Sequence, residues 1–185
     1  MHTRARSTLL AIGLAAVILL AIGCDDAARL DNFDVEVTEQ TVVEKASPLE
    51  LLLGSFPQLD AFTRFDITDQ ADFQNSKYSP DDVDSIHLST FTMRVVMPDG
   101  QDLAFLGSMV LYLETDGLPR KEIARCDDFP AGQTSVDFET TGDDLKPYVL
   151  ARESHLTVEV NDSRRPEQDT TLELQAIFDV DIKVF

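Results

Sequence analysis

The chain has no tryptophan, only two cysteines and three histidines, and few cationic side chains. The two cysteines, Cys24 and Cys126, exclude the dense disulfide framework of small secreted domains. The lack of tryptophan excludes the Cys–Trp–Cys core of antibody domains, and three tyrosines leave little material for an aromatic sugar platform. The 15 Lys and Arg residues against 34 Asp and Glu give a formal net charge of −19. So acidic a chain has no basic footprint for nucleic acid or for electrostatic docking on anionic lipid.

The first residues have the layout of an export signal. Residues 1–6 are short and cationic, and residues 9–23 form an uncharged, mostly apolar run. A membrane-spanning helix needs roughly 20 apolar residues, and the acidic pair Asp25 and Asp26 follows the run almost at once. The run is therefore too short for a transmembrane anchor and predicts a signal-peptide helix.

The segment Ala21-Ile22-Gly23-Cys24 at the end of this run resembles the lipobox of bacterial lipoproteins. In that family a small residue precedes a cysteine that is acylated and becomes the mature N-terminus. The resemblance implies cleavage between Gly23 and Cys24 and lipidation of Cys24. Ala21 stands where the family usually has Leu, and Ile22 where it usually has a small residue. A plain secretory signal is the alternative interpretation.

The resemblance also implies a location, the bacterial cell envelope, with the chain anchored in a membrane and facing the periplasm or the cell exterior. Acyl chains contribute about 0.8 kcal/mol per buried methylene, so an acidic domain needs no basic patch to stay at the bilayer. We expect residues 1–23 to be the signal peptide, 24–32 an acylated tether and 33–185 a single β-sandwich domain. The extended tether would reach roughly 30 Å.

From residue 33 onward the dominant hydrophobic period is two, which is typical of β-strands. Met109, Leu111 and Leu113 form one apolar face, while Val110 and Tyr112 lie on the other. Such two-sided apolarity favours a central strand. With turn-punctuated spacing of several short strands, the pattern predicts an all-β, antiparallel, immunoglobulin-like β-sandwich.

A change of phase within one predicted strand indicates a β-bulge. Ile86 and Leu88 have one parity, whereas Phe91 and the apolar residues after it have the other. An extra residue in one strand reverses which face its side chains point to. We therefore expect a bulge near Ser89-Thr90.

The last segment has the longest alternation in the chain. Its apolar residues of one parity are Leu172, Leu174, Ala176, Phe178, Val180, Ile182 and Val184. We expect a central strand that pairs along most of its length, because an apolar edge strand of this length would invite aggregation. It is long for a sandwich strand, so we also expect it to bend or cross between sheets near Ala176-Ile177.

Helix signals are limited to one or two short connectors. Residues 47–54 combine a possible Ser cap, Pro at the first position and a terminating Gly. Residues 79–83 offer Ser79 as a cap, Pro80 at the first position, and acids that favour the positive end of the helix dipole.

No catalytic constellation is recognisable in the sequence. Nucleophilic catalysis needs a nucleophile beside a base, and the chain lacks the GxSxG nucleophile elbow. His87 and His155 fall on the polar faces of their predicted strands, so we interpret both as surface residues. The sequence therefore predicts a protein that is not an enzyme and needs no cofactor.

Metal binding has only weak candidates. His87, His155 and Cys126 cannot complete a zinc site alone, and calcium, which prefers oxygen ligands, suits the acidic turns better. These candidates are Asp81, Asp82, Asp84, Asp127 and Asp128, with a further pair at Asp143 and Asp144. No EF-hand spacing is present, and solvated turn acids are the simpler interpretation.

Cys126 has no intrachain partner if Cys24 carries lipid. We expect a small, half-buried residue whose thiolate is disfavoured by Asp127 and Asp128; pairing between chains is the alternative. The sequence thus predicts a non-enzymatic, lipid-anchored envelope lipoprotein whose sandwich is a structural or protein-interaction module. Its expected partners are the membrane, through the lipid, and an envelope protein, with no nucleic acid. The alternative is an envelope module that binds a ligand or calcium through its acidic turns.

Overall fold

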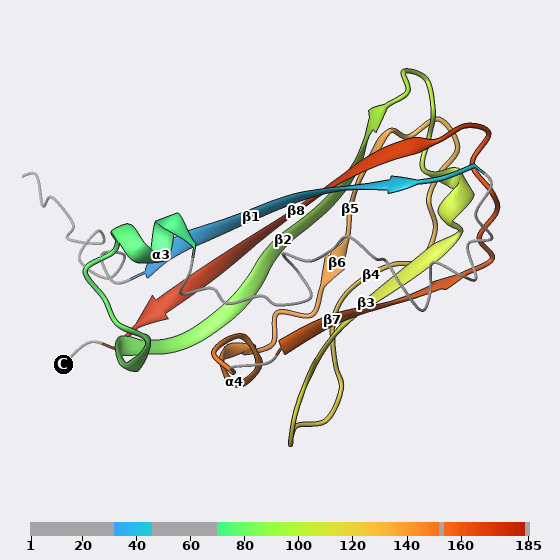
Figure 1. Ribbon diagram of the computed structural model, residues 1–185. Coiled ribbons are helices and arrows are strands. Elements are labelled where there is room, and N and C mark those ends of the chain that lie inside the picture. Colours follow the sequence, from blue (N-terminus) through green and yellow to red (C-terminus); the bar gives the residue numbers. More distant parts are fainter. Residues whose placement is uncertain (1–31, 46–69, 152–153, 184–185) are drawn as a thin grey trace, which may run out of the picture. The chain divides into compact units, whose positions relative to one another are not determined.

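Two antiparallel sheets make up the fold in the computed structural model, which describes residues 32–45, 70–151 and 154–183 (Figure 1). Sheet A has the strand order β1-β8-β2-β5, and sheet B has the order β6-β4-β3-β7. The strands are β1 (Asn32–Val43), β2 (Val83–Met97), β3 (Ser108–Thr115), β4 (Lys121–Cys126), β5 (Ser135–Asp137), β6 (Glu139–Thr140), β7 (Ser154–Asn161) and β8 (Thr170–Ile182). The all-β, two-sheet sandwich predicted from the sequence is confirmed.

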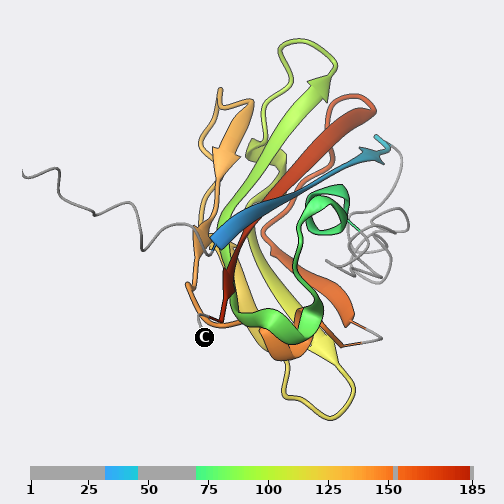
Figure 2. The same cartoon turned by 90° about the vertical axis from the view of Figure 1, so that its left-hand side faces the viewer.

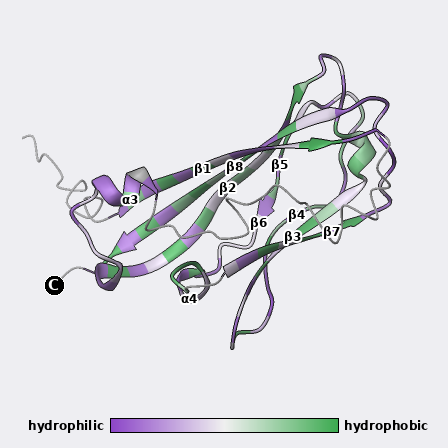
Figure 3. Ribbon diagram, viewed as in Figure 1, coloured by the Kyte–Doolittle hydropathy of each residue, from purple (hydrophilic) through white to green (hydrophobic). Residues whose placement is uncertain are grey.

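Strand β8 is the centre of sheet A. It pairs with β1 from Thr170 to Asp181 and with β2 from Thr171 to Ile182, so both of its edges are hydrogen-bonded along nearly its whole length. Every second residue from Thr170 to Ile182 is buried, and those between are partly exposed. The expected inward parity and central position are therefore confirmed, and Figure 3 shows the same alternation in hydropathy.

The crossing between sheets that was expected of β8 near Ala176-Ile177 is wrong. All of β8's partners belong to one sheet, so the strand does not cross between sheets. In β2 the register shifts between Leu88 and Thr90, and the Ser89 hydroxyl donates a hydrogen bond to the carbonyl oxygen of Ile177 at 2.9 Å. The bulge predicted at Ser89-Thr90 is confirmed, and it lets both halves of β2 bury their apolar residues.

Sheet B places β3 between β4 and β7, as the apolarity of both of its faces predicted. Met109, Leu111 and Leu113 are buried, whereas Val110 and Tyr112 are partly exposed on the outer face. Over Tyr112 lies the guanidinium of Arg120, 3.6 Å from the ring centroid. The outer position of Tyr112 on β3 is therefore covered by a long polar side chain rather than by another layer of the fold.

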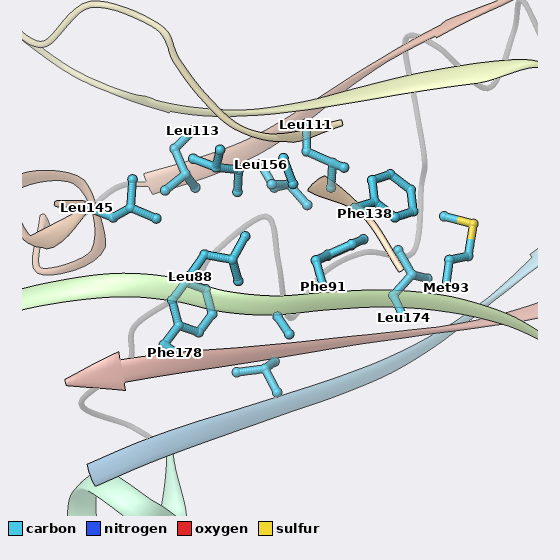
Figure 4. Close-up of a cluster of buried hydrophobic side chains, with 14 of the residues drawn as sticks. Leu88, Phe91, Met93, Leu111, Leu113, Phe138, Leu145, Leu156, Leu174 and Phe178 are labelled. Carbon is cyan, nitrogen blue, oxygen red and sulfur yellow. The ribbon is translucent and has the colours of Figure 1, made fainter. Parts of the chain in front are cut away.

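The core lies between the two sheets (Figures 2 and 4). The side chains labelled there from β2 and β8 face those labelled from β3 and β7. They include Leu88, Phe91, Leu174 and Phe178 on one side and Leu111, Leu113 and Leu156 on the other. Phe138 closes one flank, with its ring centroid 5.0 Å from that of Phe91 in an edge-to-face arrangement. Phenylalanine and aliphatic packing thus replaces the missing tryptophan.

The connectors are short turns of helix: α3 (Ala71–Asn75), α4 (Lys146–Val149) and the 3₁₀ segments η3 (Pro80–Asp82) and η4 (Ala104–Leu106). η3 is the connector predicted at residues 79–83. The Asp82 carboxylate accepts hydrogen bonds from the Ser79 amide at 2.8 Å and from its hydroxyl at 2.6 Å. The other predicted connector, residues 47–54, lies outside the described residues.

Strand pairing gives the sandwich two distinct ends. At the first, the Asn32 end, β1 and β2 begin and β8 terminates, so that Asn32 lies opposite Asp181. At the second, the loop end, β1 and β2 terminate and β8 begins, with Val43 opposite Thr170. The 12 residues of β1 separate the two ends by roughly 40 Å at about 3.3 Å per residue.

Phe178→Ala tests how much the fold depends on the inward face of β8. Phe178 is 4% exposed and borders a void of about 10 Å³ between the sheets, so truncation should lower the free energy of unfolding by about 3–5 kcal/mol. Ile177→Ala, one residue away on the outer face, is the control and should cost far less. Chemical denaturation measures both; equal losses would contradict the assigned facing of β8.

Candidate functional site

Among the described residues, three complete strand connections meet at the loop end, and we call them the loop-end connections (Figure 1). They are residues 98–107 between β2 and β3, residues 127–134 between β4 and β5, and residues 162–169 between β7 and β8. Each begins where one sheet ends and carries the chain across to the other. Connections of a rigid sandwich are where binding residues are most often found.

Backbone hydrogen bonds tie the loop-end connections to one another. The Leu103 amide donates to the Gln133 carbonyl at 2.9 Å, and the Arg164 amide donates to the Phe105 carbonyl at 2.6 Å. The Phe129 amide donates to the Gly107 carbonyl at 3.2 Å. These contacts link all three connections, so their relative positions are fixed by the fold.

At Gly107 the backbone of the first loop-end connection passes very close to the backbone at the start of the third. Its φ of +72° lies in the left-handed region, and a β-carbon there would come within 2.8 Å of the Asp162 backbone and also overlap the Asn161 carbonyl oxygen. Only glycine lets the chain after η4 pass this close to the end of β7. Gly107 therefore sets the spacing between the first and third loop-end connections.

A cavity of about 380 Å³, which we call the loop-end cavity, opens between these connections. Its lining combines two arginines, two acids and small or apolar groups: Gly100, Gln101, Asp102, Ala104, Phe105, Ala131, Arg164, Arg165, Pro166 and Glu167. Phe105 and Pro166 are buried and form its apolar part, while Arg164 and Arg165 are exposed. Its volume falls within the range of small-molecule sites.

Asp102 acts as a brace for this cavity. One carboxylate oxygen accepts a hydrogen bond from the Gly132 amide at 2.7 Å, and the other accepts one from the Ala104 amide at 3.2 Å. Both of its oxygens are therefore used on backbone amides of two different connections. The acid fixes the cavity wall instead of pairing with an arginine.

Arg164 is anchored and Arg165 is not. A guanidinium nitrogen of Arg164 donates to the carbonyl oxygen of Ala104 at 3.3 Å. Within the described part of the chain, Arg165 has no hydrogen bond or ion pair. Neither guanidinium meets a carboxylate in that part of the chain, although both lie in a strongly acidic protein.

A second surface hollow of about 410 Å³ runs beside β4 and β5, with Cys126 at its base. Its charged lining is mostly acidic and includes Asp127, Asp128, Asp137 and Glu139. Cys126 is 7% exposed, more buried than expected, and its thiol donates to the Asp128 carbonyl at 3.2 Å. Burial, assisted by the charges of Asp128 and Asp127, raises the pKa of this thiol, so the expectation of a disfavoured thiolate is confirmed.

His87 lies on the outer face of sheet A in a small polar network. Its Nδ1 donates to the Gly142 carbonyl oxygen at 3.1 Å, and its Nε2 lies 3.1 Å from the Ser85 hydroxyl. The Ser85 hydroxyl in turn donates to the Asp181 carboxylate at 2.7 Å. In a catalytic triad the serine proton faces the imidazole and an acid holds Nδ1. Here Asp181 takes the serine proton and a backbone carbonyl holds Nδ1, so the roles are not those of a triad.

His155 is exposed on β7, opposite Glu114 of β3. The two histidines therefore lie on different sheets, and neither lines the loop-end cavity or the hollow beside β4. His155 is the surface residue that the sequence predicted, whereas His87 is half-buried in its polar network.

The candidate metal ligands are divided between the two ends of the sandwich. Asp81, Asp82 and Asp84 lie where β2 begins, whereas Asp127 and Asp128 follow the end of β4 near the loop end. Asp82 is already occupied as the acceptor of the η3 cap. Within the described ranges, no three His, Cys, Asp or Glu residues come close enough to hold a metal ion.

Gly23 and Cys24, the expected cleavage and lipidation residues, lie outside the described residues. Arg164 and Arg165, which line the loop-end cavity, were not among the site residues expected from the sequence. The available signal was an adjacent pair of arginines in a chain of net charge −19. The sequence could not show that two other connections close a cavity around them.

Comparison with known proteins found no protein-family model that matches the sequence and no curated protein that matches it. Among the residues that the structure describes, no helix has the length and apolarity needed to cross a membrane.

Gly107→Ala tests whether the close approach beside η4 sets the loop-end geometry. The added methyl would overlap the backbone at the end of β7, and backbone cannot move aside as a flexible side chain can. We expect a loss of more than about 2 kcal/mol in unfolding free energy. The control is Gly100→Ala, which also has a positive φ but open space around its β-carbon and should cost about 1 kcal/mol. Similar melting temperatures for the two variants would contradict the assignment.

Asp179→Asn tests the like charges on the outer face of sheet A. Asp179 lies directly opposite Asp34 on β1. Partial burial, then the charges of Asp181 and Asp34, raises the pKa of the Asp179 carboxyl. Because its folded-state pKa is above the unfolded value, the folded state holds this proton more tightly, and ionisation at higher pH destabilises the fold. The neutral amide should therefore raise the unfolding free energy at pH 7 by roughly 0.2–1 kcal/mol.

This gain should shrink as the pH falls through the raised pKa, and should vanish at about pH 3, where the native carboxyl is itself protonated. Thermal melts over this pH range measure it. Asp116→Asn, an exposed residue of the β3–β4 turn, removes the same charge and should change the melt little. An equal gain from Asp116→Asn would mean that total charge, and not the Asp34–Asp179 pair, is responsible.

Proposed function

We propose that the chain is a non-enzymatic lipoprotein of the bacterial cell envelope, anchored by lipid on Cys24, whose β-sandwich presents the loop end to a partner. Residues 1–23 are then the signal peptide, 24–32 the tether and 33–185 the domain. An immunoglobulin-like subclass is part of this proposal. It is supported by two packed antiparallel sheets between which the chain crosses several times through its connections. In this chain β1, the first strand, pairs with β8.

The observation that carries the proposal is the position of Asn32. The tether joins the domain where β1 begins, and the loop-end connections lie where β1 terminates, roughly 40 Å away. A tether of nine residues reaches roughly 30 Å. The anchored end and the end with the braced cavity are therefore opposite ends of the sandwich, and the cavity is free to face away from the bilayer.

Charge at the Asn32 end fits attachment through lipid rather than through the protein surface. Asp34, Asp179 and Asp181 lie together on sheet A near this end, and Asp81 and Asp84 lie where β2 begins. Anionic lipid headgroups attract basic segments and repel acidic ones. The lipid thus holds the chain at the bilayer while this acidic end keeps the sandwich from lying against the surface.

The non-enzymatic part of the proposal is supported by the positions of the titratable groups. His87 serves a cross-strand network, and burial disfavours the Cys126 thiolate. The calcium alternative draws less support, because its candidate acids are divided between two ends and Asp82 is already a cap acceptor. Binding of a partner at the loop end is the function that the braced cavity and its connections support best.

Cys24→Ser tests the anchor. We expect the variant to lose metabolic labelling with a radioactive fatty acid and to move from the membrane fraction to the soluble fraction, because acyl chains supply the attachment of the mature chain to the bilayer. Cell fractionation followed by immunoblotting measures this change.

Cys126→Ser is the matched control, since it removes the chain's other cysteine and serine can still donate to the Asp128 carbonyl. It should keep both the label and the membrane location. Retention of Cys24→Ser in the membrane fraction, or loss of label from Cys126→Ser, would sink the proposal of a lipid on Cys24.

A further inference from the structure

We propose that the loop-end cavity is a binding site for a small organic anion, whose phosphate or carboxylate group is held by Arg164 and Arg165. The proposal rests on the proposed function only in taking the loop end as the face offered to ligands. It adds the chemistry of the ligand and the two side chains that recognise it.

The pairing of arginines is the first argument. The structure describes five arginines, and the three on or beside strands each meet a carboxylate. Arg94 contacts Glu173, Arg120 contacts Glu114 at 2.9 Å, and Arg125 contacts Glu122 at 2.8 Å.

Arg164 and Arg165 are the exceptions within the described ranges, where neither has a carboxylate partner. In a chain with 34 acidic residues against 15 basic ones, two adjacent guanidinium groups without an acid are unexpected. A guanidinium is a planar fork that matches the two oxygens of a carboxylate or phosphate. These two are therefore available for an oxyanion from outside the chain.

The shape of the cavity is the second argument. Its three walls are joined by backbone hydrogen bonds, and Asp102 spans two of them. Arg164 is held by its own amide on the Phe105 carbonyl and by its guanidinium on Ala104. A site fixed in this way loses little conformational freedom when a ligand binds.

The lining defines the class of ligand. Phe105, Ala104, Ala131 and Pro166 provide apolar surface beside the arginines, and the volume of about 380 Å³ fits a small organic molecule. Glu167 also lines the cavity and opposes an anion, so the site selects a ligand that engages both guanidinium groups. A bare halide would gain little there.

The overall charge of the protein makes the inference testable. A net charge of −19 disfavours diffuse accumulation of anions around the molecule. Saturable binding of an anion with a stoichiometry of one must then come from a local site.

The experiment titrates the full chain, purified in non-ionic detergent, with inorganic pyrophosphate and with citrate by isothermal calorimetry at low salt and without divalent cations. We expect at least one probe to bind one to one with a Kd of roughly 1 mM or tighter. The tighter probe identifies phosphate or carboxylate as the natural group. Absence of binding by both probes at millimolar concentration would overturn the proposal.

Arg165→Gln is the test variant, because Arg165 makes no contact that the fold needs within the described residues. Its Kd should weaken at least about tenfold, as expected for loss of a charge-assisted hydrogen bond. Arg165→Lys keeps the charge but loses the forked pair of donors. Its Kd should therefore lie between those of the parent chain and of Arg165→Gln. Arg164→Gln should weaken binding as well.

Arg125→Gln is the matched control, since it removes the same charge from an arginine outside the loop-end cavity. Its affinity should equal that of the parent chain. Unchanged binding by Arg165→Gln, or an equal loss in Arg125→Gln, would refute the site. Because none of these variants alters Cys24, membrane fractionation reports on the anchor independently of this result.

Discussion

The inward face of β8 is the constraint on which the rest of the structure depends. One parity of this strand is buried from Thr170 to Ile182, and both of its edges are paired. A strand with an apolar face this long needs a neighbour on each side, because an exposed edge would recruit other chains. β1 and β2 fill those places, and β3 and β7 cover its buried face with their own apolar residues. The bulge at Ser89 is the adjustment that keeps β2 in phase with it.

The two ends of the sandwich acquire different characters from this pairing. Since β1 and β2 both run antiparallel to β8 over nearly its full length, the end where β1 begins cannot also gather the connections that lie where β2 terminates. Those connections meet at the other end, where Gly107 permits a close backbone approach and Asp102 joins two walls. The start of β1 and the loop-end cavity are thereby separated along the length of one strand.

The pairing of charged side chains also differs between the sheets and the loop end. On the sheets, arginines pair with glutamates across strands, as Arg94 does with Glu173, and such exposed pairs each contribute little stability. The fold tolerates its excess of acidic side chains with a modest loss of stability, for example where Asp34 faces Asp179. At the loop end, the Asp102 carboxylate accepts hydrogen bonds from two backbone amides and does not pair with the guanidinium groups. Local geometry therefore leaves two guanidinium groups without an acid partner among the described residues of a chain of net charge −19.

The sequence by itself determined the strands, their facing, the bulge near Ser89-Thr90, the cap at Ser79 and the central places of β3 and β8. Each of these depends on residues close together in the chain, through the alternation of side chains or a hydrogen bond three residues away. It also carries the lipobox-like segment at Cys24, which is a local motif. Tertiary structure alone decided which strands share a sheet, that β8 stays in one sheet, and that Arg164 meets Phe105 and Asp102 meets Gly132. Those contacts join residues that are far apart in sequence, and no local pattern encodes which connection packs beside which.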